Sequence, residues 1–266
     1  MQAIESARLR EVACFLLDMD GTFYLGDELL PGALRFIETI RRQGLDFLFL
    51  TNNSSKHSAI YAQKITDLGL PLSSDKVFTS GEATAIYLHD LRPRARIYLV
   101  GTPALEEEFA DHGFTLTEEE PDFVVLGFDT TITYQKLWTL CDLVRADVPY
   151  VATHPDLNCP TADGYMPDIG AVIAFVKAST GREPRVIGKP NREMVRAVTR
   201  KMGLPEAALC MVGDRLYTDI ALGQESDITT VLVLTGETHL EDLSDSPFQP
   251  DLVCRDLNEL ADALEG

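Results

Sequence analysis

The sequence predicts an α/β protein built on mostly parallel β-sheets and divided into two domains. Short apolar runs alternate with stretches of helical periodicity along the 266 residues, an alternation typical of right-handed βαβ units. Ten candidate strands are many for one open sheet, so two α/β domains are expected. A hydrophobic content of 45% is ordinary for a globular protein with a real core.

The candidate strands are short, largely apolar runs. In chain order they are EVACFLL, LDFLFLT, KVFTS, ARIYLVG, DFVVLGF, PYVAT, RVIG, ALCMVG, TTVLVLTG and DLVC. Among the helical stretches, residues 31–44 have a proline near the first turn and end on Gly44. Residues 133–147 repeat apolar side chains with helical spacing at Tyr134, Leu137, Trp138 and Cys141.

Charge and cysteine content narrow the function and the compartment. The formal net charge of -19 and the pI of about 4.5 disfavour nucleic acid and anionic membranes as partners. An anionic substrate would therefore need a local countercharge or a metal. The five cysteines form no C-x-x-C pair and favour buried free thiols in a reducing cytoplasm. The first apolar run is too short for a secretory or membrane-spanning segment, so we expect a cytoplasmic protein.

Two carboxylates, Asp18 and Asp20, follow the first apolar run. Side chains two residues apart in an extended strand leave the same face, and Gly21 lets the backbone turn tightly, so that its amides approach a ligand. Adjacent carboxylates repel unless a cation lies between them or one stays protonated. Mg²⁺ prefers oxygen ligands of this kind. The plain alternative is an acidic turn that caps the strand.

Three further strand ends carry polar residues that complement this pair. Thr51 begins the polar run TNNSS, Lys189 lies in GKPN, and Asp214 is followed by Asp219 in the next helical turn. Taken singly, these residues read as a helix cap, a surface lysine and another cap. Because the carboxyl ends of parallel strands meet at one edge of a sheet, together they predict a phosphate and cation site.

These residues resemble the four motifs of the haloacid dehalogenase superfamily. DMDGT is similar to the first motif, Thr51 with the following NN to the second, Lys189 in GKPN to the third, and GDRLYTD to the fourth. The match spans nearly the whole chain. DMDGTFYLGDELLPGA, FLTNNSS, TSGEAT, VVLGFD and ATHPDLNCP further resemble the type IIA members, which are NagD-like and p-nitrophenyl phosphatase-like.

The resemblance implies a Rossmann-like doubly wound parallel-sheet core with an inserted smaller α/β cap. The core would comprise residues 1–80 and 186–266, and the cap, which selects the substrate, residues 81–185. Two sheets would then share the ten strands.

The resemblance also implies roles for single residues. Asp18 would be the nucleophile that forms an aspartyl phosphate, and Asp20 the general acid and then the general base. Thr51, Asn52 and Lys189 would bind the transferred phosphoryl group.

The implied cofactor is Mg²⁺, held by Asp18, the backbone carbonyl of Asp20 and Asp214. Asp219 and Arg215 would support these ligands from behind. The implied phosphate-binding loops also include Met19, Gly21 and Asn53. The position of Tyr217 is often acidic or polar in the family, so we expect Tyr217 to pack nearby without binding metal.

Residues 152–171 form the polar, Gly- and Pro-rich stretch that we expect to overhang the catalytic cleft. His154, Asp156 and Asn158 are the candidates for contact with the substrate. For His154, an ordinary capping histidine is an equal alternative.

The resulting interpretation is a Mg²⁺-dependent phosphatase of small phosphorylated metabolites, either sugar phosphates or nucleoside monophosphates. A phosphotransferase or mutase of the same superfamily is one alternative, and a receiver-like module phosphorylated on aspartate is another. Neither nucleic acid nor a membrane is expected as a partner. The sequence leaves open a homodimer formed through the cap.

Overall fold

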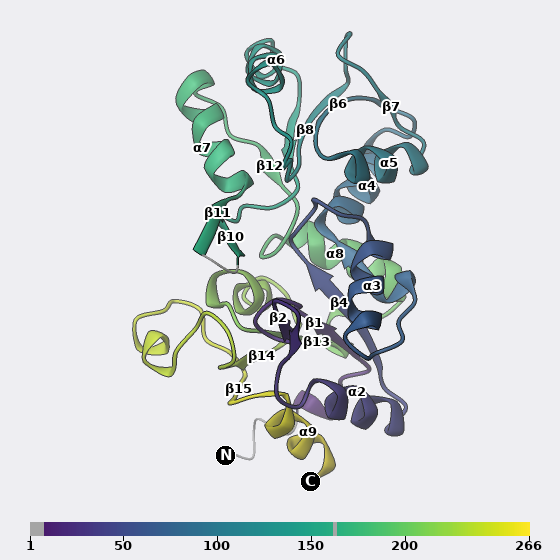
Figure 1. The fold of residues 1–266 in the computed structure, drawn as a ribbon, viewed down its shortest axis with the longest axis vertical. Coiled ribbons are helices and arrows are strands. Elements are labelled where there is room, and N and C mark those ends of the chain that lie inside the picture. Colours follow the sequence, from purple (N-terminus) through teal and green to yellow (C-terminus); the bar gives the residue numbers. More distant parts are fainter. Residues whose placement is uncertain (1–7, 162–163) are drawn as a thin grey trace. The chain divides into compact units, whose positions relative to one another are not determined.

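The computed structural model describes residues 8–161 and 164–266 (Figure 1). The chain forms two compact units. The first contains the described residues up to Thr51 together with Tyr61–Phe78 and Val198–Gly266, and the second contains Asn52–Ile60 and Thr79–Ala197. Each unit has its own sheet of hydrogen-bonded strands with helices, so the predicted α/β class is confirmed.

The first unit contains a six-stranded sheet in the order β15-β14-β13-β1-β4-β5. Its strands are β1 (Cys14–Leu17), β4 (Asp46–Thr51), β5 (Val77–Thr79), β13 (Leu209–Gly213), β14 (Thr229–Val233) and β15 (Leu252–Cys254). The pairs of β1 with β4 and β13, of β13 with β14, and of β14 with β15 are parallel. From β1 the sheet grows through β4 and β5 on one side and through β13, β14 and β15 on the other. This is the doubly wound order, and it places β1 and β13 beside the switch point where such sheets bind ligands.

Helices α2 (Ala33–Arg42) and α9 (Leu257–Glu265) pack side by side in the first unit (Figure 1). α2 buries Phe36, Ile37 and Ile40 and carries arginines in its last turn, where they favour the helix dipole. The Phe36 ring meets that of Phe15 on β1 edge to face at 5.3 Å between centroids. This packing anchors the strand that precedes Asp18.

The remaining elements of the first unit are short. A two-stranded ribbon of β2 (Tyr24–Leu25) and β3 (Glu28–Leu29) follows β1. A π-helical turn, Leu216–Ile220, follows β13. Single 3₁₀ turns lie at Ser74–Lys76, Glu206–Ala208, Ala221–Gly223 and Leu240–Ser244. Helices α3 (Ser58–Asp67) and α8 (Arg192–Met202) each cross the division between the units.

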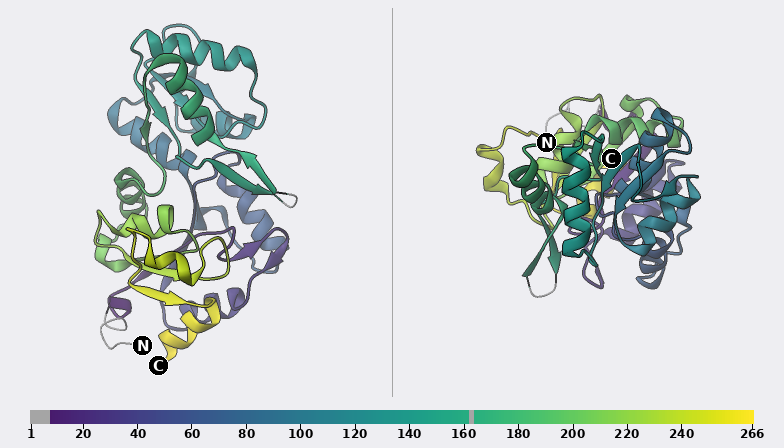
Figure 2. Two further views of the ribbon diagram at one scale, coloured as in Figure 1. Left: turned by 90° about the vertical axis from the view of Figure 1, so that its left-hand side faces the viewer. Right: turned by 90° about the horizontal axis from the view of Figure 1, so that it is seen from above.

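The second unit contains a five-stranded parallel sheet in the order β12-β9-β8-β6-β7. Its strands are β6 (Arg96–Val100), β7 (Thr115–Leu116), β8 (Phe123–Leu126), β9 (Tyr150–Ala152) and β12 (Arg185–Val186). Its helices are α4 (Ser80–Leu91), α5 (Pro103–Asp111), α6 (Tyr134–Arg145) and α7 (Ile169–Thr180). A hairpin of β10 (Asn158–Thr161) and β11 (Gly164–Pro167) projects from this unit (Figure 2).

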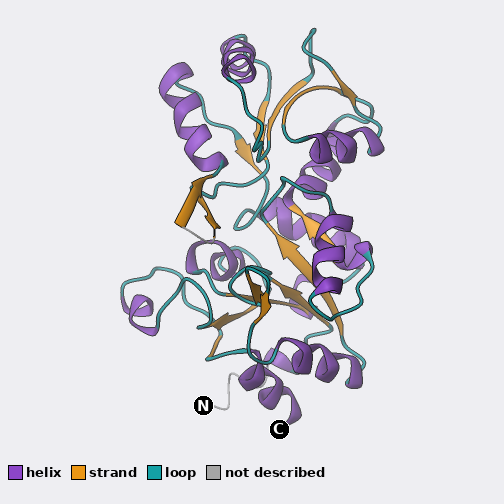
Figure 3. Ribbon diagram, in the orientation of Figure 1, coloured by secondary structure: helices purple, strands orange, loops and turns teal. Residues whose placement is uncertain are grey.

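All ten strands predicted from the sequence are present, each shorter than the run that predicted it. Figure 3 shows the strands in orange. β2, β3, β7, β10 and β11 were not predicted.

By the division of the structure, Lys189 belongs to the second unit, whereas the family resemblance assigns residues from 186 onward to the core. The boundaries of core and cap therefore stay predictions.

The buried face of α6 differs from the one that the sequence suggested. Tyr134 and Trp138 are 76% and 57% exposed, whereas Leu140, Cys141 and Val144 are buried. The same apolar spacing recurs one turn later, from Leu137 to Val144, and that second stripe packs against the sheet.

Within the described ranges, the structure contains no helix that combines the length and the apolar character needed to cross a membrane.

Candidate active site

Three buried aspartates form an acidic cluster in the first unit. Asp18 follows β1 and Asp214 follows β13, and the backbone N–H of Asp18 donates to the carbonyl of Val212 at 2.9 Å. Because these neighbouring strands are parallel, both carboxylates emerge at the same edge of the sheet. One carboxylate oxygen each from Asp18, Asp214 and Asp219 lies within 4.8 Å of the others.

The cluster has the electrostatics of a cation site. Burial, followed by the charges of Asp18 and Asp219, raises the pKa of Asp214 to about 7. Three buried carboxylates this close can share one site only if a proton or a cation offsets their repulsion. Hard divalent cations take oxygen ligands in such a shell, so the residues present fit a divalent metal.

Asp214 is held in place from several sides. Its Oδ2 accepts a hydrogen bond from the backbone N–H of Glu237 at 2.7 Å, and its Oδ1 lies 3.5 Å from the hydroxyl of Thr22. Gly21, with a positive φ of 87°, and Gly236 both pass close to its carboxylate. A Cβ at Gly21 would lie 2.6 Å from Oδ2, so the approach requires a residue without a side chain.

Asp20 is supported by the β2–β3 ribbon. The Tyr24 hydroxyl donates to Asp20 Oδ2 at 3.4 Å, and Lys64 Nζ lies 4.0 Å from the centroid of the Tyr24 ring. Burial and the neighbouring charge of Asp18 raise the pKa of Asp20, while Lys64, Arg215 and Tyr24 oppose the shift. A raised pKa makes a carboxyl group better able to hold a proton that it can donate.

Asp219, the third member of the cluster, is held by the neighbouring Arg215. The backbone N–H of Arg215 donates to Asp219 Oδ2 at 3.2 Å, and the Arg215 guanidinium pairs with Glu237 at 3.0 Å. The Tyr217 hydroxyl also donates to the Glu237 carboxylate, at 3.0 Å. Glu237 therefore links the π-helical turn to the backbone amide that holds Asp214.

Met19 and Thr51 are the remaining predicted site residues of the first unit, and both are buried. The Met19 side chain lies in the hydrophobic core, and its carbonyl accepts the N–H groups of Phe23 and Tyr24 at 2.9 and 3.1 Å. The Met19 side chain is therefore part of the core and is not exposed to a ligand.

A second group of predicted site residues lies in the second unit. Asn52, Lys189 and Asp156 are buried and joined through the Asn52 side chain, as described in detail below. Asn53 accepts hydrogen bonds from the N–H and hydroxyl of Ser55 at 2.9 and 2.7 Å. Thr51 and Asn52 are consecutive residues, so the two groups are joined by a peptide bond.

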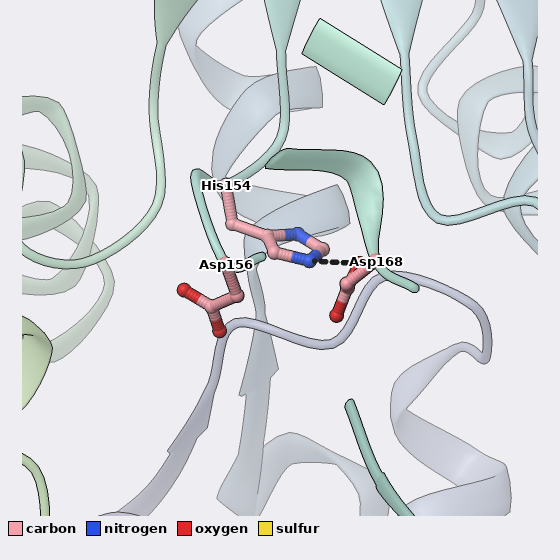
Figure 4. A group of neighbouring side chains, drawn as sticks. All are labelled: His154, Asp156 and Asp168. Atoms are coloured by element: carbon pink, nitrogen blue, oxygen red, sulfur yellow. Dashed lines mark hydrogen bonds and ion pairs between the residues drawn. The ribbon is translucent and has the colours of Figure 1, made fainter. Parts of the chain in front are cut away.

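His154 and Asn158 occupy contrasting environments. His154 is fully buried, and its ring and the Asp168 carboxylate point toward one another, with Nε2 2.9 Å from Oδ1 (Figure 4). His154 Nδ1 lies 3.0 Å from the Thr153 hydroxyl. Although His154, Asp156 and Asp168 have the proximity of metal ligands, these hydrogen bonds identify a buried polar network. Asn158 is exposed on β10.

Comparison with known proteins decides the family. The chain is 34% identical over 258 residues to an acid sugar phosphatase of Staphylococcus saprophyticus, an alignment covering 97% of this chain and 100% of that protein. It is also 34% identical over 236 residues to a 5′-nucleotidase of Bacillus subtilis, covering 89% and 92%. The chain belongs to the haloacid dehalogenase superfamily. The family descriptions that match are haloacid dehalogenase-like hydrolase over residues 15–115 and HAD-hydrolase-like over residues 186–260.

Solved structures place the chain in the type IIA, NagD-like branch of the haloacid dehalogenase superfamily. A 4-nitrophenylphosphatase from Thermotoga maritima has a TM-score of 0.93 and 48% identity, covering 97% of this chain and 99% of that one. A glycerol phosphate phosphatase from Mycobacterium tuberculosis, in complex with calcium, has a TM-score of 0.89 and 31% identity, covering 95% and 76%. With these relatives, the chain is a phosphoric monoester hydrolase of the superfamily.

Several supporting residues of this haloacid dehalogenase site escaped the sequence analysis. Glu237 lies 23 residues after the aspartate that it holds, and Asp168 lies 14 residues after the histidine that it pairs with. Neither belongs to one of the four motifs. Tyr24 does lie within DMDGTFYLGDELLPGA, the first segment that resembles the family. An aromatic residue shortly after DGT could have been considered as a site residue, but it was not.

Proposed function

We propose that the protein hydrolyses phosphate monoesters of small metabolites in the presence of Mg²⁺. The observation that carries the proposal is the convergence of three buried carboxylates within 4.8 Å, two of which follow the adjacent strands β1 and β13. Sugar phosphates and nucleoside monophosphates are the proposed substrate classes, supported by the names of the staphylococcal and Bacillus relatives. We also propose that the enzyme works in the cytoplasm.

Asp18, the backbone carbonyl of Asp20 and Asp214 would hold the cation, with Asp219 and Arg215 behind them. The mycobacterial relative was solved in complex with calcium, which supports a divalent ion as the cofactor. When bound, the cation supplies positive charge that offsets the carboxylates and the phosphoryl oxygens.

The proposed chemistry proceeds in two steps on Asp18. A carboxylate oxygen of Asp18 attacks phosphorus and the bond to the ester oxygen breaks, while Asp20 donates its proton to the departing oxygen. A water molecule then attacks the phosphorus of the aspartyl phosphate, the bond from phosphorus to the Asp18 oxygen breaks, and the Asp20 carboxylate accepts a proton from the water. Inorganic phosphate leaves, and both aspartates return to their starting states.

Binding of the phosphoryl group is assigned to Thr51 and Lys189. The Asn52 amide, which the family resemblance predicted to bind the phosphoryl group, is bonded instead to the Lys189 backbone and to Asp156, so Asn52 is assigned a supporting role. The backbones of Met19, Gly21 and Asn53 are proposed to assist. The positive charge of Lys189 would offset charge on the phosphoryl oxygens as it is transferred. The proposal requires Lys189 and Asp18 to act on one phosphoryl group.

Substrate selection is assigned to the cap, residues 81–185, with residues 152–171 nearest the substrate. Two residues of that stretch, 162 and 163, lie outside the described ranges. Asn158 is exposed on the hairpin and available for contact, whereas His154 would reach a substrate only after its surroundings moved. We therefore rank Asn158 ahead of His154.

The test is phosphate release by Asp18→Asn. The variant keeps the size of the side chain but loses the nucleophile, so we expect turnover to fall by roughly 10⁴-fold or more with an unchanged Tm. Asp46→Asn is the matched control, because Asp46 is the first residue of β4 and lies at the amino end of the strands, away from Asp18 at the carboxyl end of β1. Near wild-type hydrolysis by Asp18→Asn would contradict the assignment of Asp18 as the nucleophile.

Two further measurements complete the test. Activity should disappear with a chelator and return on addition of Mg²⁺. Phosphate should appear at the rate at which substrate is lost, whereas a phosphotransferase or mutase would lose substrate faster than it released phosphate.

A further inference from the structure

The Asn52 side chain lies across the backbone of Lys189. Its Oδ1 accepts the N–H of Lys189 at 2.8 Å, and its Nδ2 donates to the carbonyl of the same residue at 3.0 Å. Only one orientation of the amide satisfies both bonds. Because both backbone polar groups of Lys189 are tied to one planar amide, the direction in which the lysine side chain leaves the backbone is fixed.

Asp156 holds this amide in the required orientation. The second hydrogen of Asn52 Nδ2 is donated to Asp156 Oδ1 at 3.0 Å. Asn52, Asp156 and Lys189 are all less than a tenth exposed, so water competes little for these bonds. If the Asn52 amide flipped, its oxygen would face the Asp156 carboxylate and both bonds to Lys189 would be lost.

A second set of contacts fixes the backbone on either side. The Ser80 hydroxyl donates to the carbonyl of Asn52, and His154 Nδ1 lies 3.4 Å from that hydroxyl. The other ring nitrogen, His154 Nε2, lies 2.9 Å from Asp168 Oδ1, so the ring is held at both nitrogens (Figure 4). These contacts position the loop from which Asp156 projects.

Gly188 allows the close approach that the arrangement needs. A Cβ at this position would lie 2.7 Å from Asn52 Oδ1 and 2.6 Å from the carbonyl oxygen of Thr153. The residue before Lys189 therefore leaves room for the Asn52 amide.

We propose that Asp156 is a positioning residue that acts through Asn52 to fix Lys189, and that it does not itself contact the substrate. The inference rests on the proposed function, in which Lys189 binds the phosphoryl group. Since that group is common to all substrates, losing Asp156 should reduce activity by the same factor whatever the leaving group. A residue that contacted the leaving group would instead change relative rates.

The experiment compares Asp156→Ala and Asp156→Asn in the full-length protein with Mg²⁺. Values of kcat/KM are measured with 4-nitrophenyl phosphate, glucose 6-phosphate and AMP, and the Ki of inorganic phosphate is measured alongside. We expect Asp156→Ala to lower kcat/KM by roughly 10²-fold, equally for every substrate that turns over, and to weaken inhibition by phosphate. Asp156→Asn keeps an acceptor oxygen for Asn52 and should restore most of the loss.

Asp129→Ala is the matched control for loss of a buried carboxylate. Asp129 lies in the same unit, where it pairs with Lys136 and accepts from Thr131. We expect it to lower Tm without lowering kcat/KM. If Asp156→Ala does not fold, Asp156→Ser, which leaves room for water beside Asn52, takes its place, and its loss must again be equal across substrates.

Unequal losses among the substrates, or no loss at all, would overturn the inference. Lys189→Met separates this result from failure of the proposed function. If Lys189→Met keeps wild-type activity, the proposed role of the lysine is wrong. If Lys189→Met is inactive while Asp156→Ala is fully active, only the positioning inference fails.

Discussion

At the scale of single residues, the acidic cluster depends on the glycines that let the backbone reach Asp214. Gly21 and Gly236 approach its carboxylate from two segments that are far apart in the sequence. A Cβ at Gly236 would collide with Asp214, although the φ angle at Gly236 suits an ordinary residue. A substitution at Gly236 therefore tests the close contact with Asp214 without adding backbone strain.

We predict that Gly236→Ala displaces the Asp214 carboxylate. The Mg²⁺ concentration needed for half-maximal phosphate release should rise by roughly 10-fold or more. Gly44→Ala is the control: its Cβ would meet nothing within 4 Å, but its φ of 71° strains any other residue. It should therefore lower Tm and leave the Mg²⁺ dependence unchanged, and an unchanged Mg²⁺ dependence in Gly236→Ala would contradict the prediction.

The cysteines provide a second test at this scale. Burial raises the pKa values of the Cys14 and Cys254 thiols to about 12 and that of Cys210 well above its usual value, and Cys141 is buried too. Because the thiolate is the reactive form, Cys14, Cys210 and Cys254 should be inert at pH 8, and burial shields Cys141 from the reagent. The partly exposed Cys159 remains.

A chromogenic disulfide reagent at pH 8 should therefore modify about one thiol rapidly in the native protein and all five after unfolding. A rapidly reacting thiol in Cys159→Ser would contradict the assignment of Cys159 as the accessible cysteine.

At the scale of elements, α6 shows where periodicity leaves a choice. Two overlapping apolar stripes run along the helix, and only the one containing Leu140 and Val144 faces the sheet. The choice depends on how the helix packs, which its own sequence does not determine. By contrast, most of the predicted strands were identifiable because they lie in apolar runs, whereas β2, β3 and β7 are two residues each and lack such a run. β12 is as short, but it was found because the apolar residues of RVIG continue past its end.

We predict unequal stability losses for two alanine substitutions on α6. Leu140→Ala removes a fully buried side chain and should lower the free energy of unfolding by about 2–5 kcal/mol. Trp138→Ala should cost about 0.5 kcal/mol, because that side chain is 57% exposed. Chemical unfolding followed by circular dichroism gives both values. Equal losses would contradict the assignment of Leu140 to the buried face and Trp138 to the exposed face.

At the scale of the whole molecule, the net charge of -19 explains why a phosphatase of this composition needs local positive charge. The proximity of Asp18 and Asp214 was predictable because the carboxyl ends of parallel strands meet at one edge of a sheet. The supporting contacts were not: Ser80 reaches Asn52 across 28 residues, and Glu237 reaches Asp214 across 23. Such contacts arise from tertiary folding and leave no local pattern in the sequence.

The central claim is that Asp18 carries the phosphoryl group between substrate and water. Asp20→Asn keeps the backbone carbonyl but removes the base for the second step, and 4-nitrophenolate leaves without needing a proton. Rapid mixing with 4-nitrophenyl phosphate should give a stoichiometric burst of 4-nitrophenol followed by slow turnover, and mass spectrometry after acid quenching should locate a phosphoryl group on Asp18. A phosphoryl group on another residue, or no burst with turnover at the wild-type rate, would contradict the account.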